Sequence, residues 1–133
     1  MSRSGYSNDW GYDDDNYCYL YRATVDRSLA GKRGQRFLKE LAAALDAMPE
    51  KKLIADELIN AEGECCAIGV VCKTRNIDVT KIDEYDAEEV GKLVGISRSM
   101  AAEIEFENDE HVRNENPEDR WIRMRKWVGE QLR

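Results

Sequence analysis

The sequence predicts an all-α fold, a single compact domain of about five or six helices, and three observations support this prediction. Apolar residues recur at steps of three and four along most of the chain, which is the period of one helix face. Glycine, proline or a helix-capping side chain separates the successive stretches. The chain has 133 residues, of which 42% are hydrophobic, and this is enough apolar material for one core.

The first two helices are predicted on either side of Gly31. One apolar stripe recurs every four residues, and it consists of Tyr17, Tyr21, Val25 and Leu29. A second stripe begins at Phe37 and stops before Pro49, which cannot continue a helix. Because the connection is short, we expect the two helices to fold back on each other as an antiparallel hairpin.

The segment between Pro49 and Ile82 contains mixed signals. Residues 53–59 have the spacing of a short helix. The run 65–72 is continuously apolar and too short for its period to separate a strand from a buried helix. Its continuation into residues 73–75 favours a helix slightly, and a small β-hairpin across residues 53–71 is the alternative.

Three more helices complete the expected fold. Residues 86–94 have an apolar face, and Ser97 is a suitable N-cap for a helix that follows the turn. These two helices have the spacing of a helix-turn-helix, but the acidic residues of the second would repel phosphate, so we expect no DNA reading there. Residues 103–109 also alternate with period two, which is a strand signal. Asn116 and Pro117 predict the start of the last helix.

Residues 1–16 have neither a helical nor a strand period and predict an irregular arm preceding the helical domain of residues 17–133. The aromatic residues of this arm, Tyr6, Trp10 and Tyr12, either pack back on the domain or bind a partner.

The formal net charge of -7 is distributed unevenly. Residues 22–36 and residues 120–133 each carry a net charge of +4, whereas residues 83–119 carry -10. Either these segments neutralise one another, or the acidic segment forms a face for a basic partner. The acidic face and its aromatic anchors would comprise Glu103, Glu105, Glu107, Asp109, Glu110, Tyr6, Trp10 and Tyr12. The alternative anion-binding residues are Lys32, Arg33, Arg36, Arg123 and Lys126.

Several function classes are not expected. The N-terminal residues are too polar for a secretory signal, and no apolar run is long enough to span a membrane, so a cytoplasmic location is predicted. The four cysteines, Cys18, Cys65, Cys66 and Cys72, are then expected as free thiols, mostly in the core. With a single histidine and no nucleophile motif, the sequence predicts no enzyme, no metal site and no cofactor.

Six segments resemble a family of small proteins encoded by bacteriophages and prophages, for which no activity is established. They are Ser2-Arg-Ser-Gly-Tyr6, Gly31-Lys-Arg-Gly-Gln-Arg-Phe-Leu38, residues 41–49, residues 63–69, residues 107–110 and residues 117–128. The resemblance implies a bacterial host cell as the setting. We therefore expect a non-enzymatic phage accessory protein that binds a host protein with a basic surface, in its most concrete form a counter-defence inhibitor of the anti-CRISPR type.

Two other functions remain open. One is a nucleic-acid-binding regulator that uses the basic segments 22–36 and 120–133. The other is a structural or assembly protein that acts as a homo-oligomer.

Overall fold

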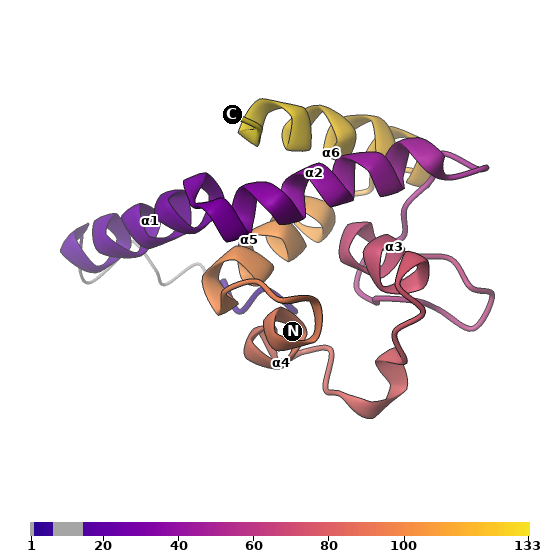
Figure 1. Cartoon of the computed structure of the whole chain (residues 1–133), viewed down its shortest axis with the longest axis horizontal. Coiled ribbons are helices and arrows are strands. Elements are labelled where there is room, and N and C mark those ends of the chain that lie inside the picture. The colour runs from indigo at the N-terminus through magenta and orange to yellow at the C-terminus, as the bar shows by residue number, and fades with distance from the viewer. Residues whose placement is uncertain (1, 7–14) are drawn as a thin grey trace.

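The computed structural model describes residues 2–6 and 15–133, and the side chains of residues 2–6 and 20–133. The described residues form six α-helices and no β-strand, which confirms the predicted all-α class (Figure 1). The helices are α1 (Asp15–Ala30), α2 (Lys32–Ala47), α3 (Ala67–Thr74), α4 (Ala87–Val94), α5 (Arg98–Asp109) and α6 (Pro117–Gln131), with a 3₁₀ turn η2 (Val79–Lys81).

Helix α5 lies at the centre of the packing. It contacts α1, α3, α4 and α6, while α2 packs on α1, α3 and α6. Figure 1 shows α2 and α6 side by side, running in opposite directions. The core between them is aliphatic, and its fully buried side chains include Leu38, Leu41, Ile104, Met124 and Val128. In the part of the chain that is described, no helix is long and apolar enough to cross a bilayer.

The predicted antiparallel hairpin of the first two helices is wrong. Helices α1 and α2 follow one another along the molecule, separated by the single residue Gly31 (Figure 1). Gly31 is extended (φ -69°, ψ 165°), which changes the direction of the chain without reversing it. Gly34 makes this break close-packed, because a Cβ at this position would lie 1.9 Å from the Ser28 carbonyl oxygen.

Gly34→Ala is expected to lower the free energy of unfolding by about 3 kcal/mol, the upper end of the usual cost of overpacking, because the obstructing atom belongs to the backbone. Urea unfolding of the variant measures this cost. Gly129→Ala is the matched control: the nearest atom to its added Cβ is the flexible Arg125 guanidinium at 3.4 Å. The control should be neutral or more stable by about 0.5–1 kcal/mol, since alanine favours a helix interior. Equal losses in the two variants would contradict the close packing at Gly34.

The helix predicted at residues 53–59 is also wrong, and residues 53–71 form no β-hairpin. Instead residues 53–66 form an irregular loop that contains one isolated bridge, between Ile59 and Cys65. The backbone at the start of this loop bonds to residues well beyond one helical turn, since Leu53 N–H donates to the Pro117 carbonyl at 3.0 Å and Ile54 N–H to the Cys65 carbonyl at 2.9 Å. The apolar run that follows is helix α3, as the slight preference for a helix predicted.

The three C-terminal helices match their predictions closely. Asp86, Ser97 and Asn116 cap α4, α5 and α6 by accepting backbone hydrogen bonds. Gly95, at φ 84°, ends α4 in the left-handed conformation that glycine adopts freely. The strand signal at residues 103–109 is overridden, because α5 continues helically to Asp109.

Candidate functional site

Arg3 is the centre of a buried ionic cluster on α5. Its side chain is 0% exposed. Its Nε and Nη2 donate to the two carboxylate oxygens of Asp109, both at 2.8 Å. Its Nη1 lies 3.6 Å from the nearer carboxylate oxygen of Glu105 and 3.6 Å from the Cys66 sulfur. A bidentate arginine–carboxylate pair is strong and directional, so Arg3 anchors the N-terminal residues to α5.

The residues next to Arg3 add two further contacts to the same helix. The Ser4 hydroxyl donates to the carboxylate of Glu110. The Tyr6 hydroxyl donates to Glu103 at 2.8 Å, and its ring packs on Phe106 with centroids 5.0 Å apart. Of the two alternatives for the arm, residues 2–6 therefore follow the first and pack back on the domain.

Glu103 is shared between the N-terminal segment and α1. Arg22 on α1 donates to both oxygens of this carboxylate, at 3.2 and 2.9 Å. The Arg22 Nε also lies 3.5 Å from a carboxylate oxygen of Asp26 on the same helix. Since Tyr6 and Arg22 approach Glu103 from different elements, this carboxylate is almost fully buried, with 4% of the residue exposed.

Glu105 differs from its acidic neighbours because neither of its carboxylate oxygens has a hydrogen-bond partner among the described residues. The residue is 0% exposed. Burial raises the pKa of Glu105 to about 8, and Arg3 offsets only part of this effect. The folded protein consequently favours the neutral carboxyl group at pH 7.

The structure thus brings Tyr6, Glu103, Glu105, Asp109 and Glu110 together, as the predicted acidic face required. However, these acids line a site that the chain's own residues fill, and they form no open acidic surface. The physical reason is the central position of α5, which other elements cover on several sides.

The remaining members of the predicted acidic face do not join this cluster. Glu107 is half-buried, and its carboxylate lies 3.8 Å from the Arg123 guanidinium and 3.7 Å from the His111 ring nitrogen. Trp10 and Tyr12 lie outside the described residues. The sequence prediction missed the roles of Arg3 and Arg22, since neither an arginine in a polar arm nor a half-exposed arginine on α1 carries a periodic signal that would indicate its distant partner.

The predicted basic segment 120–133 is largely used inside the fold. Arg120 is buried and donates to the carbonyl oxygens of Leu53, Asn108 and Glu115. Arg123 pairs with the Glu115 carboxylate through two hydrogen bonds, of 2.8 and 2.9 Å. Arg125 pairs with Asp46. Lys126 remains exposed, so this segment offers an anion far less charge than its sequence indicates.

The other basic segment stays open to solvent. We use the name basic corner for five exposed cations at the end of α1 and along the first half of α2: Arg27, Lys32, Arg33, Arg36 and Lys39. None of them forms an ion pair with any described residue. The adjacent N-terminus of α2 has no side-chain cap and no acidic residue in its first turn. Because the C-terminal carbonyl groups of α1 lie against this end of α2, the positive charge of the corner comes from its unpaired side chains.

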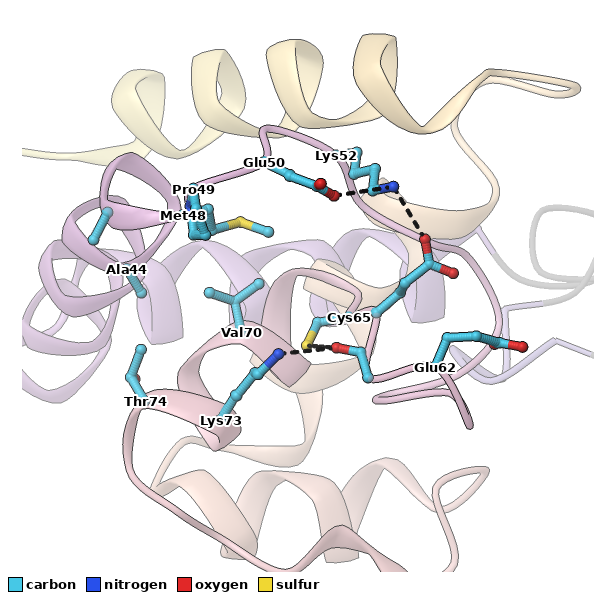
Figure 2. A pocket seen from close by; sticks show the side chains of 13 residues that line it. Ala44, Met48, Pro49, Glu50, Lys52, Glu62, Cys65, Val70, Lys73 and Thr74 are labelled. Atoms are coloured by element: carbon cyan, nitrogen blue, oxygen red, sulfur yellow. Dashed lines mark hydrogen bonds and ion pairs between the residues drawn. The ribbon is translucent and has the colours of Figure 1, made fainter.

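A cavity of about 550 Å³ lies between the C-terminal end of α2, helix α3 and the loop after Pro49 (Figure 2). Its rim is charged, but Lys52 pairs there with Glu50 and Glu64, at 3.1 and 3.4 Å. Figure 2 shows the Lys73 ammonium directed to the Gly63 carbonyl, which is 3.1 Å away. These polar groups satisfy one another, so the described lining presents no convergent set of groups for a reaction.

The cysteines behave as small apolar side chains. Cys65, Cys66 and Cys72 are free and buried, which confirms the prediction for these three; the side chain of Cys18 is not among those described. Burial raises the pKa of each thiol, that of Cys72 to about 12, and so disfavours the reactive thiolate. The described residues include no group of three or more side chains placed to hold a metal ion.

Comparison of the chain with protein-family models, curated proteins and solved structures finds no match.

Proposed function

We propose that this is a non-enzymatic binding protein and that its basic corner binds the phosphate backbone of a nucleic acid. One observation carries the proposal: the five cations of the corner are exposed and without ion-pair partners among the described residues, while the acids of α5 are paired inside the fold. This favours the nucleic-acid-binding function inferred from the sequence over the exposed acidic face. Lys32, Arg33 and Arg36 are kept from the predicted residues, Arg123 and Lys126 are left out, and Arg27 and Lys39 are added.

The spacing of the basic corner suits a phosphate backbone. Lys32, Arg36 and Lys39 lie on one face of α2, four and three residues apart. They span roughly 10 Å at a rise of about 1.5 Å per residue. One nucleic acid strand presents a phosphate about every 3.4 Å along its axis, so the stripe covers about three phosphates.

The net charge of -7 does not cancel the basic corner. Within residues 22–39 the only acid is Asp26, which pairs with Arg22 at 3.5 Å, and a group of exposed acids lies elsewhere. Asp78, Asp83, Asp86, Glu88 and Glu89 are exposed around η2 and the start of α4. Figure 1 shows these elements at the lower edge of the molecule, whereas α2 runs along its upper side. This separation would orient the basic corner toward a polyanion during an encounter.

Fluorescence anisotropy with a labelled 20-nucleotide DNA, single-stranded or duplex, tests the proposal at low salt. We expect binding that weakens steeply with salt, because bound cations release counterions. Lys32→Ala, Arg33→Ala and Arg36→Ala combined should reduce the slope of log K against log salt by about 2–3. The matched control combines Lys81→Ala, Lys92→Ala and Arg113→Ala, which remove the same charge from exposed positions elsewhere. No binding at about 50 mM salt, or equal losses in both variants, would exclude the basic corner as the site.

A protein partner is the second candidate function. It is favoured by the arginine-containing segment that already occupies the acidic site on α5. This candidate concerns a different surface from the basic corner, and the contacts at α5 define it more closely.

A further inference from the structure

We infer that the surface of α5 beneath residues 2–6 is a recognition site for an extended basic segment of a partner protein, and that residues 2–6 are its intramolecular occupant. The partner segment would carry an arginine at the place of Arg3 and a second basic residue at the place of Ser4. This inference goes beyond nucleic-acid binding and uses none of the residues of the basic corner.

Side chains make the contacts that dock the segment, so the site recognises sequence. Arg3, Ser4 and Tyr6 each reach a different acid of α5, namely Asp109, Glu110 and Glu103. Among the described hydrogen bonds, the backbone of residues 2–6 donates none to α5. Any segment that presents an arginine and a tyrosine with this spacing could therefore make the same contacts.

The chain's own segment leaves the site incompletely satisfied. Both oxygens of Glu105 lack a hydrogen-bond partner among the described residues, although this side chain is fully buried. Among the described residues, Glu110 accepts a hydrogen bond from the neutral Ser4 hydroxyl and pairs with no cation. Because the carboxyl group of Glu105 is mostly neutral at pH 7, three carboxylates, those of Glu103, Asp109 and Glu110, face two arginines, Arg3 and Arg22. The excess of negative charge favours an occupant that is more basic than residues 2–6.

A partner must compete with a segment that is covalently attached. Tethering through a short linker gives an effective concentration of about 1 mM, so a free segment of equal affinity would displace residues 2–6 only at similar concentrations. One added charge pair with Glu110 would improve the affinity by about tenfold or more and bring competition into the micromolar range.

The test uses synthetic peptides added to the full chain. One peptide has the sequence of residues 1–7, a second replaces its Ser4 by lysine, and the control replaces its Arg3 by alanine. The full-length Arg3→Ala chain, whose own segment has lost its anchor, should bind the first peptide at micromolar concentrations and the lysine peptide about tenfold more tightly. Binding of the control peptide should be at least about tenfold weaker than that of the first. Isothermal calorimetry measures each affinity.

Each outcome decides the inference. Arginine-dependent binding to the Arg3→Ala chain supports it, and so does weaker binding to the wild-type chain, where the attached segment competes. If Arg3→Ala alone fails to fold, recovery of helical circular dichroism on adding the first peptide supports the inference, and no recovery overturns it. Equal binding of the arginine and alanine peptides, or no gain from the lysine, also overturns it. Loss of DNA binding in the basic-corner variant leaves these results unaffected, so the two proposals fail independently.

Discussion

Arg3→Ala is expected to lower the free energy of unfolding by about 3–5 kcal/mol, the usual cost of removing one partner from a buried ion pair. The substitution leaves the Asp109 carboxylate and the carboxyl group of Glu105 without their guanidinium partner in a site that is closed to water. If residues 2–6 are released, water reaches these acids and solvates them. The decrease in the free energy of unfolding then cannot exceed the free energy with which the segment docks on α5. Urea unfolding measures the loss, and hydrogen exchange in α5 reports the release.

Two further variants make the Arg3 prediction specific. Arg3→Lys should fall between wild type and alanine, because an ammonium keeps the charge but loses the bidentate geometry. Arg113→Ala removes an exposed arginine and should change the stability by less than about 0.5 kcal/mol. If Arg3→Ala is as stable as Arg113→Ala, Arg3 does not anchor the segment.

Glu105→Gln is expected to stabilise the protein above pH 6 and to flatten the pH dependence of its stability. The folded-state pKa of Glu105 is raised from 4.5 to about 8. The folded protein therefore binds more protons than the unfolded chain between these values, and stability is fully present below pH 4.5 and lost as pH rises to about 8. At about 1.4 kcal/mol per pKa unit, this loss is of the order of 5 kcal/mol. Glutamine resembles the neutral carboxyl group and does not ionise.

Unfolding in urea at pH 5, 6, 7 and 8 measures the effect of Glu105→Gln. The variant and the wild type should agree at pH 5 and diverge progressively toward pH 8. Glu118→Gln makes the same chemical change at an exposed position and should leave the wild-type profile unchanged. Parallel profiles for wild type and Glu105→Gln would show that the buried carboxyl group does not titrate in this range.

Local signals in the sequence predicted the C-terminal half of the fold well. The caps at Asp86, Ser97 and Asn116 are formed by a side chain and the backbone two or three residues later, so neighbouring residues determine them. The errors lie where distant groups decide the local structure. Residues 53–59 form no helix because their backbone bonds to residues near 65 and 117. The break at Gly31 is too short to reverse the chain, and a close contact at Gly34 stabilises the arrangement.

The sequence by itself determined the helical class, most helix boundaries and the separation of basic and acidic segments, because periodicity and capping act within a few residues. Only the tertiary structure decided which charges neutralise one another and which stay open. Arg3 reaches Asp109 across 106 positions and Arg22 reaches Glu103 across 81. These pairs turn the predicted acidic face into an occupied site and leave the basic corner exposed. Their formation depends on how the helices pack around α5, and no local pattern in the chain contains that information.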